Sequence, residues 1–177
     1  MFIVLVNNKF AREVTEAEIT DWKEKGGLTY WIPHQMVINP ASKSTPIRTV
    51  FNNSLVHQGF SFNSAVDLGP DMTNNLHGTL MRFREDVIGG QGDVRKMYYN
   101  IRVTREEEFM QMWKWHFRGE SKPRMFCMTR LVMGSKPSAN CSQMALRETA
   151  YIEDNDKKHP EAAEALVKNS YVDNTFI

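Results

Sequence analysis

The chain has 177 residues, of which 41% are hydrophobic and 24% are charged, and its formal net charge is +1. This length and composition suit one globular domain with a hydrophobic core, and they exclude a disordered, collagenous or low-complexity chain. The near-neutral charge neither favours nor excludes nucleic-acid binding, because local basic patches determine that property. Two cysteines, Cys127 and Cys141, are too few for a Cys-rich zinc site and are typical of a reduced, intracellular protein of the cytoplasm or nucleus.

The N-terminal segment predicts one short strand and one helix. The apolar run from Met1 to Val6 is too short for a signal-peptide core or a membrane span, so we expect a strand there and no membrane partner. Thr15-Glu16-Ala17-Glu18 has the pattern of a capping box, which satisfies backbone N–H groups at the start of a helix. This helix is expected to run to about Lys25, because Gly26-Gly27 ends it.

Residues 28–52 have the pattern of an antiparallel β-hairpin. The segment 35–38 and the alternating segment 47–51 are the expected strands, and the polar residues 39–44 are the expected turn. Residues 29–32 are also predicted to be extended.

A helical pattern begins after Pro70, with Asp71 as the expected N-cap. Its apolar residues at helical spacing, which we expect to be buried against a sheet, are Met72, Leu76, Leu80 and Phe83. Val87-Ile88 then indicates a strand leading into Asp93, although the intervening glycines weaken that strand.

Aromatic residues alternate in the next segment, and this alternation has two interpretations. The residues could form a platform on which nucleic-acid bases stack, or they could pack in the core, and we favour core packing. They are Phe109, Trp113, Trp115 and Phe117. A turn at Arg118-Gly119-Glu120 is expected next, followed by a β-rich run from Met125 to Val132.

The C-terminal segment predicts two helices and an extended end. Residues 138–151 are helical in pattern, residues 153–158 form a polar loop, and Pro160 is suited to the first turn of a helix that reaches Lys168. Tyr171-Val172 is extended again. Because helices and strands mix without a regular βαβ alternation or a linker, we predict a single α+β domain in which helices pack on an antiparallel sheet.

Two aspartates, Asp93 and Asp173, lie 80 residues apart and could act in one site. Two-metal nucleotidyl transfer requires acidic side chains brought together on neighbouring strands, and Mg²⁺ prefers carboxylate oxygens. Asp93 would end one strand, and Asp173 would lie in a hairpin turn. Taken alone, either aspartate is more often a surface or capping residue. Their order along the chain, with the Gly134 turn and a helix between them, supports the functional interpretation.

A series of short motifs carries a family resemblance. They are Tyr30-Trp31-Ile32-Pro33-His34-Gln35, Ile47-Arg48-Thr49-Val50-Phe51-Asn52, Phe62-Asn63 with Gly69-Pro70, Arg82-Phe83-Arg84, Asp93-Val94-Arg95-Lys96-Met97-Tyr98, His159-Pro160-Glu161-Ala162-Ala163 and Tyr171-Val172-Asp173. In this order they resemble the reverse transcriptases of BEL/Pao-class LTR retrotransposons, from about Ala11 to the end of the chain. The resemblance implies the fingers and palm of a reverse-transcriptase-like polymerase, with residues 11–90 as a fingers-like region and residues 91–177 as a palm.

The resemblance also implies catalytic roles. It identifies the chain with an RNA-directed DNA polymerase, a nucleotidyltransferase that copies a template from dNTPs by a two-metal mechanism. Asp93, Asp173 and Asn174 would be the catalytic residues, and Asp93 and Asp173 would bind Mg²⁺. The implied partners are a nucleic-acid template–primer and dNTPs.

Four further residues would bind the substrate by the same resemblance. Arg48 would grip the incoming triphosphate, as suits a guanidinium group. Tyr98 would screen the 2′ position of the sugar. Met133 and Gly134 would border the nucleotide pocket. Without the resemblance, ordinary core packing explains Tyr98 and Met133 equally well.

The sequence departs from the family pattern in ways that affect activity. Asn174 stands where the family has the second Asp of its Tyr-x-Asp-Asp turn, which removes a negative charge and weakens the expected Mg²⁺ site. Asn52 replaces an Asp of many relatives. The chain ends three residues after Asn174, so we expect the second strand of that hairpin, the thumb, the RNase H and the integrase to be missing.

We therefore predict a fragment of a retrotransposon reverse transcriptase that is inactive as this isolated chain. The alternative is a non-catalytic module, domesticated for nucleic-acid binding or protein interaction, that keeps the palm as a scaffold. A third interpretation is an ordinary α+β protein in which the motifs arose by chance.

Overall fold

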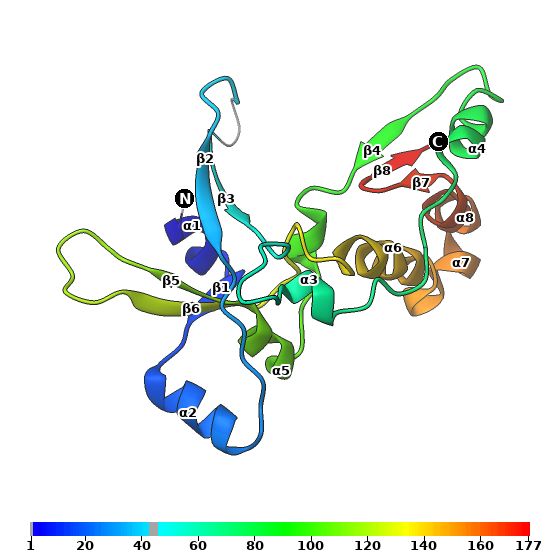
Figure 1. Cartoon of the computed structure of the whole chain (residues 1–177). Coiled ribbons are helices and arrows are strands. Elements are labelled where there is room, and N and C mark those ends of the chain that lie inside the picture. Colours follow the sequence, from blue (N-terminus) through cyan, green and yellow to red (C-terminus); the bar gives the residue numbers. More distant parts are fainter. Residues whose placement is uncertain (1, 43–45) are drawn as a thin grey trace. The chain divides into compact units, whose positions relative to one another are not determined.

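The computed structural model describes residues 2–42 and 46–177, and the chain divides into two compact units (Figure 1). Unit 1 consists of Met1–Asp67 and Tyr99–Lys136, and unit 2 consists of Leu68–Tyr98 and Pro137–Ile177. Each unit is thus built from two separate segments of the chain. The limits of the fingers-like and palm regions stay a prediction.

Unit 1 contains a three-stranded antiparallel sheet, a separate β-hairpin and short helices. The sheet has the order β1-β6-β5 and consists of β1 (Ala11–Glu13), β5 (Met112–Trp115) and β6 (Arg124–Met128). The hairpin consists of β2 (His34–Ile38) and β3 (Ile47–Phe51). The helices are α1 (Phe2–Asn7), α2 (Glu16–Glu24), α3 (Phe62–Ala65), α5 (Arg105–Glu108) and the 3₁₀ helix η2 (Phe109–Gln111).

The sheet of unit 1 buries side chains on both of its faces, because successive residues of a strand point to opposite sides. Trp113 and Phe126 belong to one hydrophobic cluster, whereas their neighbours Met112 and Cys127 belong to another. Trp113 is 1% exposed and Phe109 is 3% exposed. Core packing is therefore confirmed for Phe109 and Trp113, and Trp115 and Phe117 are half-buried against the cluster that contains Trp113.

The hairpin predicted over residues 28–52 is confirmed in its two strands, β2 and β3. Val37 lies opposite Arg48 in the antiparallel pair. The last two residues of the predicted turn 39–44 lie outside the described part of the chain. Residues 29–32 are not a regular strand but are held by backbone bonds, including one of 2.7 Å from the Ile32 N–H to the Met112 carbonyl.

Helix α2 begins and ends where the sequence predicts. The Thr15 hydroxyl accepts a hydrogen bond of 3.2 Å from the Glu18 N–H, and Gly26 follows the helix with a φ of +80°. The Glu18 carboxylate forms an ion pair of 2.9 Å with Arg12 and another with Arg105. This ion pairing ties the start of α2 to β1 and α5.

The N-terminal apolar run is a helix, α1, and not the predicted strand. Leu5 is only 4% exposed and belongs to the cluster that contains Trp113. The turn after α1 is closed by a bond of 2.8 Å from the Phe10 N–H to the Leu5 carbonyl. A short apolar run does not distinguish a buried helix from a buried strand, and here tertiary packing selects the helix.

Unit 2 contains a small antiparallel sheet and several helices. The sheet has the order β4-β8-β7 and consists of β4 (Gln91–Asp93), β7 (Ser170–Tyr171) and β8 (Asn174–Phe176) (Figure 1). Its helices are α4 (Leu76–Arg82), α6 (Ser138–Thr149), α7 (Asn155–Lys158), α8 (Pro160–Lys168) and the 3₁₀ helix η3 (Ile152–Asp154). The 3₁₀ helix η1 (Met97–Asn100) has residues in both units. The two longest helices, α6 and α8, agree with the prediction, whereas the polar segment predicted as a loop folds into η3 and α7.

The prediction that the C-terminal hairpin lacks its second strand is wrong. Strand β8 pairs with β7 on one side and with β4 on the other, so it is the central strand of the sheet. Three residues are enough for this strand, because each neighbour supplies a ladder of backbone hydrogen bonds.

The helix whose N-cap was predicted at Asp71 has its N-cap at Asn75, four residues later. The Asn75 side chain caps α4 by accepting a bond of 2.9 Å from the Gly78 N–H. Asp71 instead accepts a bond of 2.9 Å from the Thr73 N–H in a local turn. Asn and Asp cap helices about equally well, so residue type alone does not decide between Asp71 and Asn75.

Two further predictions for this segment are wrong. Leu76 is 41% exposed and Leu80 is 36% exposed, whereas Thr79 is fully buried, so the buried face of α4 is not the predicted apolar one. Val87 and Ile88 are exposed in bends, and no strand precedes β4 there.

Replacing Leu76 with alanine should therefore cost less than about 1 kcal/mol of unfolding free energy, because the side chain leaves little cavity behind. A fully buried leucine would cost roughly 2–5 kcal/mol. Chemical denaturation measures this difference, and a loss above 2 kcal/mol would show that Leu76 is packed more tightly than its exposure indicates.

The two cysteines should differ sharply in reactivity. Cys127 is fully buried, and burial raises the pKa of its thiol to about 12, whereas Cys141 is exposed. Because the thiolate is the reactive form, a thiol reagent at neutral pH should label one cysteine in the folded protein and two after denaturation. The Cys127 thiol ionises at lower pH in the unfolded chain than in the folded one, so its contribution to stability should be lost as pH rises above about 9.

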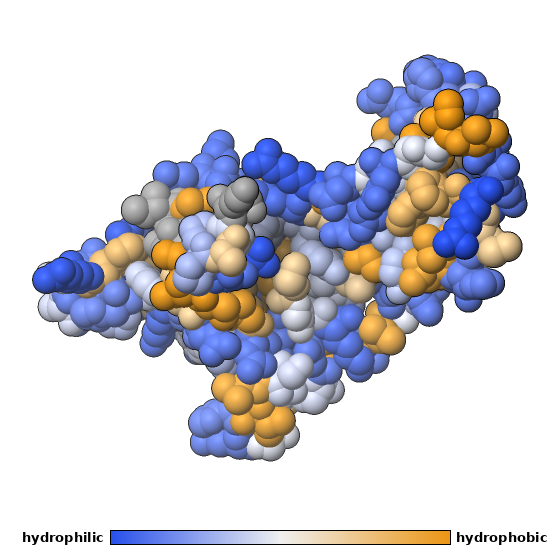
Figure 2. All heavy atoms as spheres, turned by 90° about the horizontal axis from the view of Figure 1, so that it is seen from above, coloured by the Kyte–Doolittle hydropathy of each residue, from blue (hydrophilic) through white to orange (hydrophobic). Residues whose placement is uncertain are grey.

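The face drawn in Figure 2 is mainly hydrophilic, with several groups of apolar side chains among the polar ones. Among the residues that the structure describes, no helix combines the length and the apolar character needed to cross a membrane.

Candidate active site

The two candidate aspartates meet at one end of the β4-β8-β7 sheet. Asp93 is the last residue of β4 and lies opposite Asn174, the first residue of β8. Asp173 lies in the turn between β7 and β8, and its carbonyl accepts a bond of 2.7 Å from the Val94 N–H. The backbones of Asp93, Asp173 and Asn174 are therefore adjacent, although the first is 80 residues from the second.

The turn that carries Asp173 has a backbone conformation that is rare for its residue type. Val172 has a φ of +54°, a left-handed conformation that β-branched residues seldom adopt. Gln143 of α6, which is 2% exposed, donates a hydrogen bond of 2.6 Å from its Nε2 to the Val172 carbonyl. This bond helps to hold the turn, because it supplies a buried donor to a carbonyl at the strained residue.

Asn74 anchors the strand that leads into the turn. Its Nδ2 donates to the Val167 carbonyl at 2.9 Å and to the Ser170 carbonyl at 2.8 Å. Its Oδ1 accepts a bond of 2.9 Å from Arg147 of α6. The end of α8 and the start of β7 are thereby tied to one side chain.

The side chain of Asn174 connects two other residues of the site. Its Nδ2 donates to the Asp173 Oδ1 at 3.1 Å, and its Oδ1 accepts a bond of 2.7 Å from the Nε2 of Gln91 in β4. Asp93 is exposed, whereas Asp173 and Asn174 are half-buried. The Asp173 carboxylate thus has a neutral hydrogen-bond donor beside it.

Tyr98 is electrostatically coupled to this site. Burial is the main reason that the pKa of its hydroxyl is raised, and the negative charge of Asp173 raises it further. The phenol of Tyr98 therefore stays protonated near Asp173 at neutral pH.

The acidic residues at this turn do not make up a full two-metal donor set. Among residues 2–42 and 46–177, no group of three or more His, Cys, Asp or Glu side chains is placed to hold a metal ion. Asp93 and Asp173 supply the carboxylates, and Asn174 directs its amide nitrogen, not its oxygen, at Asp173. A nitrogen that donates a hydrogen bond does not ligate Mg²⁺, so this arrangement does not fit two magnesium ions.

The other three predicted site residues belong to unit 1. Arg48 is exposed on β3, and Met133 is 70% exposed. Gly134 has a φ of +100°, and a Cβ added there would lie 3.0 Å from the Phe51 carbonyl oxygen, so the turn requires glycine. Asp93, Tyr98 and Asp173 lie in unit 2, so a joint role with Arg48, Met133 and Gly134 stays a prediction.

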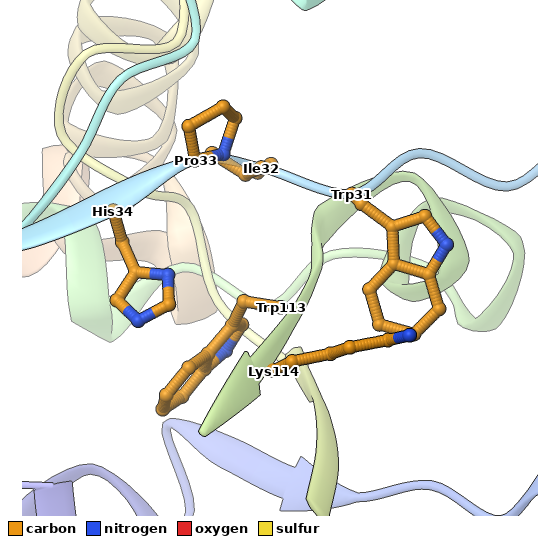
Figure 3. A pocket seen from close by; sticks show the side chains of 6 residues that line it. All are labelled: Trp31, Ile32, Pro33, His34, Trp113 and Lys114. Carbon is orange, nitrogen blue, oxygen red and sulfur yellow. The ribbon is translucent and has the colours of Figure 1, made fainter. Parts of the chain in front are cut away.

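A shallow cavity of about 340 Å³ lies in unit 1 (Figure 3). Its lining residues are Trp31, Ile32, Pro33, His34, Trp113 and Lys114. The Lys114 ammonium lies 4.7 Å from the centre of the Trp31 ring, and burial lowers the pKa of His34. None of the predicted site residues lines this cavity.

A second cavity, of about 270 Å³, lies in unit 2 and also excludes the predicted site residues. It is lined by Tyr151, Asp156, Pro160, Ala163, Glu164, Val167 and Lys168. Neither cavity contains the candidate site, in which Asp93 is exposed and Asp173 and Asn174 are half-buried.

Sequence reasoning missed the residues that support the turn, Gln91, Gln143 and Asn74. All three are amides that contact residues far away in the sequence, with separations of 83, 29 and 96 residues for one bond of each. Amide side chains have no motif of their own, so only the folded arrangement reveals them.

Comparison with known proteins gives a likeness in fold. No family model matches the sequence, and no curated protein matches it. Among solved structures, it is similar to a foamy viral protease-reverse transcriptase in complex with ds DNA, with a TM-score of 0.61, 13% sequence identity and coverage of 98% of this chain and 24% of that chain.

Two structures of the prototype foamy virus protease-reverse transcriptase are also similar. Their TM-scores are 0.52 and 0.56, their identities are 18% and 16%, and each comparison covers 90% of this chain and 18% of that chain. The chain spans about a quarter or less of the length of these relatives. Its helices and antiparallel sheets thus form a reverse-transcriptase-like fold.

Proposed function

We propose that this chain corresponds to the fingers and palm of a retrotransposon reverse transcriptase of the BEL/Pao class. The ancestral activity is template-directed DNA synthesis from dNTPs. The observation that carries this proposal is the strand pairing that sets Asp93 opposite Asn174 and bonds Val94 to Asp173. The order of the motifs and the likeness to foamy viral protease-reverse transcriptase support it.

The proposed partners are a template–primer and dNTPs. In this proposal, Asp93 and Asp173 are the catalytic carboxylates, and Tyr98 lies beside them to exclude a 2′-hydroxyl. Arg48 binds phosphate, and Met133 and Gly134 border the nucleotide. Magnesium binds weakly, because only two of these residues are acidic.

We expect no robust primer extension by this chain on an RNA template with Mg²⁺. Asn174 lacks the charge of a second acidic residue, and the chain spans only a fraction of the related polymerases. The experiment compares dNTP incorporation by the unaltered protein, by Asn174→Asp and by Asp93→Ala, each with Mg²⁺ and with Mn²⁺. If the unaltered chain extends the primer and Asp93→Ala does not, the predicted inactivity is wrong and the catalytic role of Asp93 is supported.

Binding of a fluorescent dNTP to the protein mixed with a template–primer duplex tests the proposal independently of activity. Replacing Arg48 with alanine should weaken dNTP binding about tenfold, because hydrogen bonds to the charged triphosphate contribute roughly 1.5–3 kcal/mol. Arg118→Ala is the matched control, since Arg118 is also exposed but lies in the β5–β6 turn. Fluorescence anisotropy measures both affinities, and equal effects of the two substitutions would remove the proposed role of Arg48.

One observation favours the non-catalytic alternative. Asn174 donates a hydrogen bond to Asp173, which gives the carboxylate a partner within the protein. If the chain is a nucleic-acid-binding module, duplex binding should persist in Asp93→Ala, and neither the unaltered chain nor Asn174→Asp should extend a primer.

A further inference from the structure

We infer that Gln91 and Asn174 form a hydrogen-bond relay that provides Asp173 with an internal partner and thereby disfavours divalent cations at this turn. The inference rests on the proposed function, since it concerns the cation requirement of that same site. The relay runs from the Gln91 Nε2 to the Asn174 Oδ1, at 2.7 Å, and from the Asn174 Nδ2 to the Asp173 Oδ1, at 3.1 Å.

Both ends of the relay determine the orientation of the Asn174 amide. An amide group has one oxygen that accepts and one nitrogen that donates. Turning the amide over would bring its oxygen against the Asp173 carboxylate and its nitrogen against the Gln91 nitrogen. Both contacts would be repulsive, so the network selects the observed orientation.

This orientation competes with a cation at Asp173. Magnesium and manganese ions bind oxygen, and the Asn174 oxygen is already engaged by Gln91. For Asn174 to ligate a cation beside Asp173, its amide must rotate and lose both bonds. Each lost bond reduces the apparent affinity roughly two- to tenfold.

Backbone hydrogen bonds fix the turn at Asp173, so the backbone cannot easily move the carboxylate away from the Asn174 amide. The Asp173 carbonyl accepts from Val94, and the preceding Val172 carbonyl accepts from the buried Gln143. Rearrangement is therefore confined to the side chains. The relay also joins β4 to β8 at the end of the sheet, so it stabilises the pairing of Asp93 with Asn174 without a metal ion.

The test measures binding of Mn²⁺ alone by calorimetry, without nucleic acid, together with thermal unfolding in the presence and absence of Mn²⁺. Asn174→Asp replaces the donor beside Asp173 with a third carboxylate, so we expect at least a tenfold gain in Mn²⁺ affinity and a cation-dependent rise in Tm. Gln91→Leu releases the Asn174 oxygen while keeping both aspartates, so it should give a smaller, several-fold gain.

Asn75→Asp is the matched control, because it adds the same negative charge to unit 2 and Asp caps a helix as well as Asn does. It should leave Mn²⁺ affinity unchanged. An unaltered protein that binds Mn²⁺ as tightly as Asn174→Asp, or a Gln91→Leu variant with no gain, would overturn the inference. Failure of the unaltered protein to bind a template–primer duplex would count against the proposed function and would leave this cation result intact.

Discussion

Replacing Trp113 with alanine should lower the free energy of unfolding by about 3–5 kcal/mol, the usual cost of removing a large buried aromatic side chain. Trp113 is 1% exposed and its ring contacts those of His34, Phe51 and Phe126, with centroids 5.2, 5.7 and 5.2 Å away. The substitution therefore empties the centre of the cluster that joins the hairpin to the three-stranded sheet. Chemical denaturation monitored by circular dichroism measures the loss.

Lys114→Ala is the control for Trp113→Ala, since Lys114 is the next residue of β5 and is exposed. It removes one contact with the Trp31 ring and should cost no more than about 1 kcal/mol. Equal losses in the two variants would show that Trp113 is not the centre of this core.

Replacing Gln143 with methionine should cost about 1–3 kcal/mol, because the Val172 carbonyl then lacks its buried donor while the side-chain volume is retained. The turn that carries Asp173 should also become more mobile. Hydrogen exchange at the amide of Val94, which is bonded to the Asp173 carbonyl, reports that change.

Met144→Ala is the matched control on the same helix, because Met144 is 53% exposed. It should leave both stability and exchange at Val94 nearly unchanged. Faster exchange in Met144→Ala but not in Gln143→Met would contradict the role of the Gln143 hydrogen bond.

The helices and strands that were predicted correctly are those set by interactions between residues close together in the sequence. Thr15, Gly26 and Pro160 act on neighbouring residues, so the limits of α2 and the start of α8 could be read from local patterns. The alternation in residues 47–51 likewise predicted β3 and its partner. Local patterns were enough for these elements, because the residues that start or end each one interact with residues close to them in the sequence.

The helix α1 and the face of α4 needed tertiary information. The apolar run at the N-terminus suits a strand or a helix, and the packing of Leu5 against the core decides for the helix. In α4, Thr79 is buried while Leu76 is not, because the neighbours of a helix select its buried face. The spacing of hydrophobic residues predicts an apolar face of a helix, but it does not predict which part of the protein packs against the helix.

For the candidate site, the sequence by itself determined the order of Asp93, the Gly134 turn and the Asp173 turn, and it identified Asn174 as a departure from the family pattern. Only the tertiary structure decided that β8 is the central strand and that Asn174 bridges Gln91 and Asp173. The physical reason is that hydrogen bonds between amide side chains depend on distance and orientation, and residues 83 positions apart acquire these only when β4 and β8 pair.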